Sequence, residues 1–548
     1  MICILHGWLL EGSGSNLWTR SVITALARAG QTVHLVCQEN HPDLYPAIAE
    51  AWSYDANGDR HLIMKRDVPY KGRCILHQPW IGDPLPVFVW DKYEQYQHVV
   101  PMIEMSDEEL EAYIQRNVDV VSRIVHDHPI SAIHANHAVL MSVVAQRVSR
   151  ATAVPFAIMP HGSGIEYAVK KDERFARYAS SALEDAIAVF VIGSEMRQRV
   201  NSIFASVRGI DEKCIELHLG VDTSQFDPAE RFERRRQIGL LFSRLNGAPR
   251  GKTAQQRSRM LSGLSDEISI SDTKTLFRSE TYDGKTPDAD VEDKLDTIDW
   301  DHDPTLLFTG RLISAKGIQS VIAALPLLLH EVPELRLILV GHGPLREPME
   351  ALVAAFERGD RVLASKIVKW GRALEGDLEG EGEETELSDV SHYWNDLESR
   401  GALDEYFAMA KRNVRSDRVL FTGYLTHDQL RFLFPCCDVG VFPSVVREAG
   451  PLVFLEALAS GCFSLGTYFG GMAASINAVS EVLPAESGDV MKLDPGNTVA
   501  DIASKVPKAL NLAPAHKDVL AGFARERYDW ATVAAKMIEV LESRPEVS

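Results

Sequence analysis

Short apolar segments alternate with amphipathic segments along two long stretches of the chain. In the first stretch, the segments predicted to be strands are 2–6, 32–37, 132–134, 155–159, 188–192 and 215–217. The helices predicted between them begin near Asn16 and cover 139–148, 175–184 and 195–204. In the second stretch, the predicted strands are 305–309, 335–340, 419–421 and 439–442, and the predicted helices are 318–329, one after Pro344, 427–434 and one from Pro451. Such alternation indicates parallel sheets covered by helices on both faces.

The pattern therefore predicts an α/β protein with two Rossmann-like lobes. We divide the chain into an N-terminal lobe (1–227), a polar insertion or linker (228–304), a C-terminal lobe (305–527) and a last helical segment (528–548). Ligands of such sheets bind beyond the carboxyl ends of the strands. Candidate chemistry is therefore expected in the loops that follow strands.

Two segments interrupt the alternation. Residues 228–304 are polar and poorly periodic, and residues 371–413 contain the acidic, glycine-spaced run 376–386. Such a composition does not bury a core of its own. We interpret both as insertions and favour solvated loops for both.

Composition and charge exclude several classes of protein. The chain has 548 residues with 57 Lys+Arg against 77 Asp+Glu, a net charge of −20, which disfavours binding to nucleic acid. No apolar run is long enough to span a bilayer, and the first residues read as a strand and not as a signal peptide. The seven cysteines include no CxxC pair, and Cys436 and Cys437 are expected to be buried, reduced thiols. We expect a cytoplasmic protein.

The most informative motif is the segment 447–461, which surrounds a predicted helix start. Pro451 suits the first position of a helix, and the free amides of Leu452 and Val453 would then form a phosphate site. Glu448 precedes this helix and Glu456 lies inside it, so the two carboxylates can reach different ends of one ligand. A carboxylate accepts two hydrogen bonds, which suits a sugar or ribose diol.

Six further motifs occur in order along the chain, at 11–15, 160–162, 219–226, 309–317, 340–344 and 421–425. Together with the two glutamates separated by seven residues, they resemble glycosyltransferase family 4. Members of this family are retaining, nucleotide-sugar-dependent enzymes of the GT-B fold. The resemblance implies two lobes facing each other across a cleft, with the acceptor on the N-terminal lobe, the donor on the C-terminal lobe, and 528–548 crossing back to the first lobe.

The resemblance also implies a role for individual residues. Arg311 and Lys316 would clamp the donor diphosphate, Glu448 would contact the transferred sugar, and His161 would touch the sugar near the reacting face; these four are the expected catalytic residues. The remaining donor contacts would come from Gly12, Gly14, Gly341, Tyr424, Leu425, Ala449, Gly450, Leu452, Val453 and Glu456. Among them, Glu456 would hold the ribose diol, and the backbone of Tyr424 and Leu425 would meet the base edge. No cofactor and no metal is implied, because arginine and lysine neutralise the phosphates.

Several patterns imitate metal sites. His134 and His137 have the spacing of metal ligands, but they also match the strand end that lines the acceptor cleft in the family. The pairs Asp288/Asp290 and Asp301/Asp303 resemble a metal-binding DxD motif. They lie in or beside the first insertion, so we interpret them as solvated acids.

Two segments could contribute surfaces. The basic stretch 231–259, with its apolar run 238–242, could touch a membrane, although an ordinary arginine-rich family segment is the favoured interpretation. An aromatic cluster, formed by Trp80, Phe88, Trp90, Tyr93 and Tyr96, is either an acceptor lip or a packed loop.

The sequence thus predicts a retaining transferase that moves a hexosyl unit from a nucleotide-diphosphate sugar to a hydroxyl of a sugar, lipid or small-molecule acceptor. Two alternatives stay open: a GT-B epimerase or hydrolase of nucleotide sugars, and a non-catalytic sugar-nucleotide sensor. The base, the sugar, the acceptor, peripheral membrane association and homo-oligomer formation are also left open. No integral membrane association and no nucleic-acid partner is expected.

Overall fold

The computed structural model describes residues 1–543 except 12, 89–95, 97, 283–284, 377–384, 448–449 and 451. The chain forms two compact units. Unit 1 comprises Met1–Gly220 and Arg527–Ser548, and unit 2 comprises Val221–Glu526.

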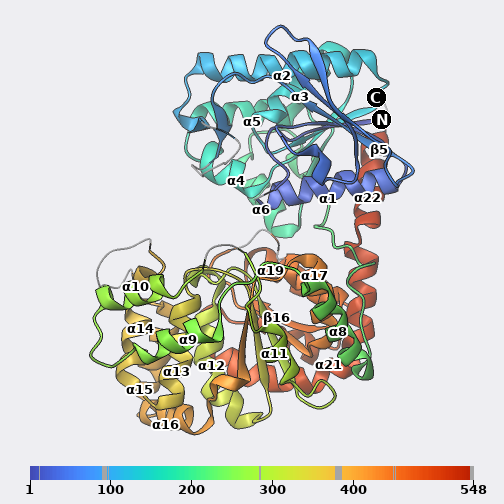
Figure 1. Cartoon of the computed structure of the whole chain (residues 1–548). Helices are drawn as coiled ribbons and strands as arrows, with labels where there is room; N and C mark the ends of the chain where they lie inside the picture. Colours follow the sequence, from blue (N-terminus) through green and yellow to red (C-terminus); the bar gives the residue numbers. More distant parts are fainter. Residues whose placement is uncertain are drawn as a thin grey trace. The chain divides into compact units, whose positions relative to one another are not determined.

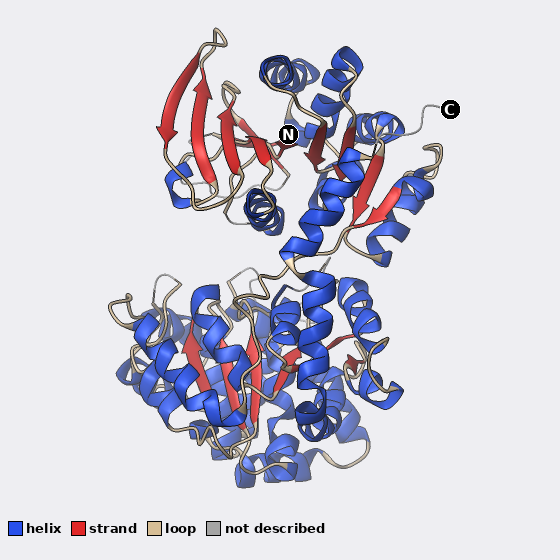
Figure 2. Cartoon of the chain, turned by 90° about the vertical axis from the view of Figure 1, so that its right-hand side faces the viewer, coloured by secondary structure: helices blue, strands red, loops and turns tan. Residues whose placement is uncertain are grey.

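Unit 1 is built on a nine-stranded sheet with the order β11-β10-β9-β8-β1-β2-β5-β3-β4 (Figures 1 and 2). All neighbours in it pair in parallel except β3 and β4, which pair antiparallel. Its strands are β1 (Ile2–Leu5), β2 (Thr32–Val36), β3 (Ile48–Tyr54), β4 (Arg60–Lys65), β5 (Arg73–Gln78), β8 (Ala132–Asn136), β9 (Phe156–Met159), β10 (Ala188–Val191) and β11 (Cys214–Glu216). A separate pair consists of β6 (Leu85–Val87) and β7 (Val99–Pro101).

The helices of unit 1 cover both faces of this sheet. They are α1 (Gly14–Arg28), α2 (Asp107–Asp127), α3 (Met141–Thr152), α4 (Gly162–Gly164), α5 (Glu173–Asp185), α6 (Ser194–Ile203), α7 (Ile210–Lys213) and α22 (Trp530–Glu542), with the short turns η1 (Pro42–Leu44), η2 (Met102–Glu104) and η3 (Ile165–Val169). Successive residues of a strand point to opposite faces, so Ile2 and Ile4 join one core with α1 and α22. Cys3 and Leu5 join the other core with α2 and α3. The C-terminal helix α22 therefore completes the core of unit 1 (Figure 1).

Unit 2 contains a six-stranded parallel sheet with the order β14-β13-β12-β15-β16-β17. Its strands are β12 (Thr305–Thr309), β13 (Arg336–Val340), β14 (Val419–Gly423), β15 (Val439–Phe442), β16 (Phe463–Thr467) and β17 (Lys492–Leu493). Numbered from its first strand, this is the order 3-2-1-4-5-6 of a dinucleotide-binding sheet. The strand order reverses between β12 and β15, and this switch point is where ligands of such sheets bind.

The helices of unit 2 are α8 (Arg234–Leu245), α9 (Ala254–Ser262), α10 (Ile270–Ser279), α11 (Val291–Asp296), α12 (Ile318–Glu331), α13 (Arg346–Arg358), α14 (Arg361–Leu374), α15 (Ser388–Ser399), α16 (Leu403–Asn413), α17 (His427–Leu433), α18 (Leu452–Ala459), α19 (Gly470–Ser480) and α20 (Ala485–Val490). Shorter turns are η4 (Arg231–Glu233), η5 (Ser314–Lys316), η6 (Ser416–Arg418) and η7 (Phe434–Cys436). The long helix α21 (Thr498–Tyr528) ends unit 2 and leads into unit 1.

The interpretation of residues 228–304 as a solvated loop is wrong for the residues that the structure describes. This segment forms α8 to α11 within unit 2. Ile238, Leu241 and Leu245 of α8 are buried, and α8 packs against α17. Three apolar side chains of the basic stretch are therefore used inside unit 2, whereas Phe232 and Leu240 are exposed.

The interpretation of residues 371–413 as a solvated loop is also wrong, apart from 377–384, which lie outside the described residues. Helices α15 and α16 occupy most of the segment. Their side chains Trp394, Tyr406 and Phe407 are buried and pack edge to face around Phe356 of α13. In the sequence, the acidic composition of the segment drew attention away from these aromatic residues, which α15 and α16 bury.

All seven cysteines are buried and unpaired, which confirms the expectation for Cys436 and Cys437. Within the described ranges, the helices include none with the length and apolar character needed to cross a membrane.

Candidate functional site

Two loops meet at the switch point of the unit 2 sheet, one after β12 and one after β15. The backbone N–H of Val445 donates to the carbonyl of Ala315 at 2.9 Å. Gly317 has a φ of +74°, and a Cβ at this position would lie 1.9 Å from the carbonyl oxygen of Pro443. Only glycine allows this approach, so the sequence Lys316-Gly317 brings the predicted phosphate-binding loop against the end of β15.

The first loop carries the two predicted cations. Arg311 is exposed, and no described residue forms an ion pair with its guanidinium. Lys316 is half-buried at the end of η5, and the loop is fixed where Ser314 donates from its backbone N–H and its hydroxyl to Glu375, at 2.6 and 2.7 Å. Gly341 closes the adjacent strand end, where a Cβ would lie 1.9 Å from the carbonyl oxygen of Gly310. An exposed arginine and a half-buried lysine on a fixed loop suit an anionic ligand.

Glu456 lies inside α18 with its side chain 9% exposed. Its Oε1 pairs with Nδ1 of His427 at 2.8 Å, while its Oε2 is buried and has no hydrogen-bond partner among the described residues. An unpartnered buried carboxylate oxygen is costly, so this atom is expected to accept hydrogen bonds from a bound group. A ligand diol would satisfy it, as the sequence suggested.

The N-terminus of α18 begins at Leu452, and Leu452, Val453 and the preceding Gly450 are half-buried. The amides of a first helical turn have no partners within the helix and attract anions. Glu448 and Ala449, predicted to contact the sugar and donor, lie outside the described residues, as does Pro451.

The backbone N–H of Tyr424, one of the groups predicted to meet the base edge, is engaged within unit 2. It donates to the carbonyl of Thr286 at 3.0 Å and is therefore already used. The neighbouring bridge between Pro287 and Gly423 extends the sheet beyond β14. Leu425 is buried, with a relative exposure of 2%. A base edge at this strand end would have to contact other backbone groups than the Tyr424 N–H.

Asp288 is not a solvated acid: its relative exposure is 0%. Its backbone N–H donates to Thr422 at the end of β14, and its carboxylate receives two hydrogen bonds from Arg346, at 2.6 and 2.5 Å. Lys294 adds a third contact at 2.6 Å. A sequence-based interpretation could not detect this, because Arg346 lies 58 positions away.

The other three acids of the imitation DxD motifs differ in exposure. Asp303 is buried and pairs with Arg336 at 2.7 Å. Asp290 is half-buried beside Lys294, and Asp301 is half-buried with its carboxylate paired with Arg235. The interpretation as a solvated acid is therefore wrong for Asp303, whereas the side chain of Asp301 is 39% exposed and remains solvated within a surface ion pair.

In unit 1, polar side chains gather where the strand order reverses between β1 and β8. The ring of His6 follows β1, Asn136 ends β8, and His161 follows β9. Nε2 of His161 lies 2.9 Å from Oδ1 of Asn136, and burial lowers the pKa of His161 to about 3. His161 is therefore neutral at physiological pH, and it lies at a strand end where the sheet geometry favours ligand binding.

The remaining histidines of this region are buried beside aromatic rings. His137 packs against Trp8 and Phe88 with ring centroids 4.7 and 4.8 Å away, and both of its ring nitrogens lack hydrogen-bond partners. His134 lies 3.3 Å from Asn136 through Nε2. Among the described residues, no three His, Cys, Asp or Glu side chains are arranged to hold a metal ion.

The residues of the predicted aromatic cluster differ in their surroundings, and the predicted glycine loop is described only in part. Phe88 packs inside unit 1, Tyr96 donates its hydroxyl to Gln38 at 3.1 Å, and Trp80 is 44% exposed. Trp90 and Tyr93 lie outside the described residues, as does Gly12. Gly14 is the first residue of α1, and a Cβ there would meet no other atom within 4 Å.

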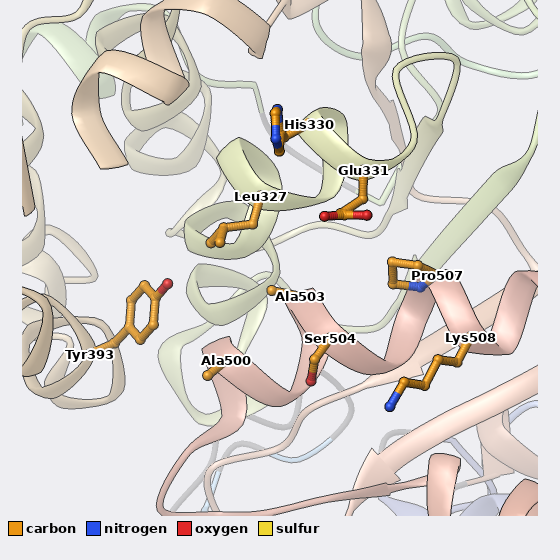
Figure 3. Close-up of a pocket in the computed structure, with 9 residues that line it drawn as sticks. All are labelled: Leu327, His330, Glu331, Tyr393, Ala500, Ala503, Ser504, Pro507 and Lys508. Atoms are coloured by element: carbon orange, nitrogen blue, oxygen red, sulfur yellow. The ribbon is translucent and has the colours of Figure 1, made fainter. Parts of the chain in front are cut away.

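A cavity of about 490 Å³ lies elsewhere in unit 2, between α12, α15 and α21 (Figure 3). It is lined by Leu327, His330, Glu331, Tyr393, Ala500, Ala503, Ser504, Pro507 and Lys508. Helix α12 begins near the carboxyl end of β12 and ends before β13, so this cavity is at the amino edge of the sheet. None of the predicted site residues lines it.

Comparisons with known proteins agree with the architecture of unit 2. Family models described as "Glycosyl transferases group 1" match residues 292–371 and 398–511. Over these residues, unit 2 is similar to the group 1 glycosyl transferases. The matched ranges contain Arg311, Lys316 and Gly341 in one part, and Tyr424, Leu425 and Glu456 in the other.

One curated relative is 2-deoxystreptamine N-acetyl-D-glucosaminyltransferase from Streptomyces fradiae, 34% identical over 104 residues. The match covers 17% of this chain and 24% of that enzyme, so the chain matches about a quarter of its length. Among solved structures, a glycosyltransferase from Rickettsia africae has 12% identity and a TM-score of 0.53, with 99% of this chain and 97% of that chain covered. Sucrose-phosphate synthase from Thermosynechococcus elongatus has 16% identity and a TM-score of 0.49, covering 98% and 97%.

The likeness to the Rickettsia africae structure supports a GT-B fold, and each of the two units is a Rossmann-like fold. The predicted fold class and the resemblance to group 1 glycosyl transferases are confirmed.

Proposed function

We propose that the protein is a retaining glycosyltransferase that moves a hexosyl unit from a nucleotide-diphosphate sugar to an acceptor hydroxyl. The observation that carries the proposal is the buried Oε2 of Glu456, which has no partner among the described residues and lies in the same domain as the two cations of the β12 loop. A nucleotide sugar supplies both a diol for the carboxylate and a diphosphate for the cations.

The chemistry follows from the charges. As the bond between the sugar and the diphosphate breaks, negative charge grows on the departing phosphate. Arg311 and Lys316 stabilise that charge, and the amides at the start of α18 add dipoles of the same sign. Glu448 would contact the transferred sugar. The acceptor hydroxyl attacks the anomeric carbon from the face that the phosphate leaves, and the phosphate takes up the hydroxyl proton.

The role of His161 follows from its neutral state. A neutral imidazole can accept a hydrogen bond from a sugar hydroxyl without adding a positive charge beside the oxocarbenium-like centre. The proposal includes no metal and no cofactor, because the arginine and lysine side chains provide the countercharge.

The experiment is a nucleotide-release assay. Purified protein is incubated with UDP-, GDP- and ADP-sugars, with and without a mixed acceptor extract, in the absence of added metal. Release that requires the extract supports transfer and identifies the donor. Equal release without acceptor indicates a hydrolase or epimerase. Thermal stabilisation by a nucleotide without turnover, for every acceptor tried, indicates a sensor.

A further inference from the structure

The polar network of unit 1 begins at His6. Nε2 of His6 lies 3.0 Å from the carbonyl oxygen of Leu9 and 3.0 Å from Oδ1 of Asn16. Because a carbonyl oxygen only accepts hydrogen bonds, Nε2 of His6 carries the proton. Burial lowers the pKa of His6 to about 4, so at neutral pH its Nδ1 is a bare lone pair.

This lone pair fixes the orientation of the Asn136 amide. Nδ2 of Asn136 lies 3.4 Å from Nδ1 of His6 and donates to Oγ1 of Thr19 at 3.0 Å. The single proton of the Thr19 hydroxyl has two acceptors in reach, the carbonyl of Ser15 at 2.8 Å and Nδ1 of His6 at 3.2 Å. A flipped amide would place its oxygen against the lone pair of Nδ1 and would compete for this one hydroxyl proton, so the NH₂ group faces His6 and Thr19.

The amide oxygen of Asn136 then faces two histidines. It lies 2.9 Å from Nε2 of His161 and 3.3 Å from Nε2 of His134. Since this oxygen only accepts, Nε2 of His161 must carry a proton. No described residue hydrogen-bonds to Nδ1 of His161.

We propose that Asn136 is a positioning residue that holds His161 in its Nε2–H tautomer and leaves Nδ1 as a hydrogen-bond acceptor for a sugar hydroxyl. The tautomer assignment stands on the geometry of unit 1 alone, while the sugar hydroxyl rests on the proposed function. The carbonyl of Leu9 fixes the proton of His6 on Nε2, and His6 in turn fixes the orientation of the Asn136 amide. The amide oxygen then fixes the proton of His161 on Nε2.

The groups around His161 preserve its neutral state. The titratable side chains that face it are His6, His134 and His137, all buried and all with lowered pKa values. At the neighbouring Gly162, Nη1 of Arg199 would lie 3.7 Å from a Cβ, and this arginine pairs with Glu195 and Glu166. No carboxylate among the described residues contacts the His161 ring, so nothing there raises its pKa.

The first test reads the tautomer directly and needs no substrate. Long-range ¹H–¹⁵N correlation spectra of the full chain labelled with ¹⁵N-histidine are recorded between pH 5 and pH 8, and His161 is assigned by its absence in His161→Gln. We expect a neutral Nε2–H pattern for His161 across this range, and a mixture of tautomers in Asn136→Ala. A wild-type Nδ1–H pattern, or an unchanged Nε2–H pattern in Asn136→Ala, overturns the proposal.

The second test uses the pH profile of Asn136→Asp. A carboxylate still accepts the Nε2 proton but favours the charged ring, and so raises the pKa of His161 by about 1–3 units. Activity should then fall on the acid side at a pH about 1–3 units higher than in the wild type. Asn117→Ala, which removes another buried amide hydrogen bond of unit 1, should leave the profile unmoved.

The two tests separate the proposals. An unmoved profile in a folded Asn136→Asp protein contradicts the role of Asn136. A wild type that shows the expected tautomer but transfers no sugar with any donor contradicts the proposed function and leaves the positioning intact.

Discussion

Nδ1 of His427 lies 2.8 Å from Oε1 of Glu456, while the second oxygen of the same carboxylate is buried without a partner in the part of the chain that the structure describes. His427 starts α17 and Glu456 lies in α18, so the pair joins the helices that follow β14 and β15. The contact holds the carboxylate in one orientation. The unpartnered oxygen is then the atom left for a ligand.

Glu456→Gln tests this assignment. The amide cannot accept two hydrogen bonds at full strength, so we expect the donor KM to rise about 10-fold or more, in keeping with about 1.5–3 kcal/mol for a hydrogen bond to a charged group. Initial rates at varied donor concentration measure it. Glu331→Gln, an exposed glutamate at the amino edge of the same sheet, is the matched control. An unchanged KM in Glu456→Gln contradicts the diol contact.

Arg311→Ala should lower kcat by about 10²–10³, since loss of one group that stabilises transition-state charge costs about 3–4 kcal/mol. The thermal midpoint should stay near that of the wild type, because Arg311 is exposed and no described carboxylate pairs with it. Single-turnover rates and a melting curve provide both quantities. Arg361→Ala removes an exposed, ion-paired arginine of the same domain and should leave the rate unchanged. Full activity in Arg311→Ala would remove this residue from the phosphate clamp.

Asp288→Asn should lower the free energy of unfolding by about 3–5 kcal/mol, because it leaves Arg346 buried without its bidentate partner. Urea unfolding monitored by fluorescence measures the change. The double variant Asp288→Leu with Arg346→Met should lose less than either single change, since neither charge then remains buried alone. Equal free energies of unfolding for Asp288→Asn and the wild type would contradict the burial of this ion pair.

Gly317→Ala and Gly14→Ala form a matched pair. A Cβ at Gly317 would collide with the carbonyl oxygen of Pro443 at 1.9 Å, whereas one at Gly14 meets nothing within 4 Å. We expect Gly317→Ala to displace the phosphate loop and reduce kcat/KM by an order of magnitude or more, as about 1.4 kcal/mol corresponds to each tenfold change. Gly14→Ala should be tolerated. Comparable activity of the two variants would contradict the contact between the loops.

The free energy of unfolding should decrease as the pH is lowered from 6.5 towards 4. The pKa of His6 is lowered by burial from 6.5 to about 4, so between these values the unfolded chain binds more protons than the folded one. The stabilisation is complete above pH 6.5 and is lost as the pH falls towards 4. For this one group, the loss from pH 7 to pH 5 is about 2 kcal/mol. Urea midpoints at both pH values test it, with His6→Gln expected to show a smaller loss. An equal loss in His6→Gln would show that other groups cause the dependence.

The sequence predicted the strands that build both switch points. The apolar runs at β12 and β15 were assigned with the residues that the structure shows, and the glycine-rich loop after β12 lies where expected. These features are local, since a buried parallel strand reads as a short apolar run between turn residues. By contrast, β4 was missed because it is largely exposed and its sequence does not alternate clearly. Its neighbours β3 and β5 were also missed, although both are largely buried.

Helix α2 could have been found from its ends. Ser106 and Glu109 form a capping box, a local signal for a helix start that the sequence analysis did not use. The burial of Lys252 could not have been found in this way. Its amine contacts Glu347 and Glu350 of α13, at 2.9 and 2.8 Å. A local sequence pattern cannot predict ion-pair partners that lie almost a hundred positions away.

The contact of Asn136 with His161 shows the same limit within the candidate site. The motif that contains His161 was recognised, but its tautomer depends on a relay from Leu9 and His6 at the start of the chain. Sequence placed the residues at strand ends, and only the folded sheet brings those ends together.

The most direct measurement of the central claim is a ¹H NMR time course with the donor found in the release assay and its acceptor. The account predicts one glycoside formed for each nucleotide released, with the anomeric configuration of the donor retained in the product. Free sugar in place of glycoside, or a glycoside of inverted configuration, would contradict it.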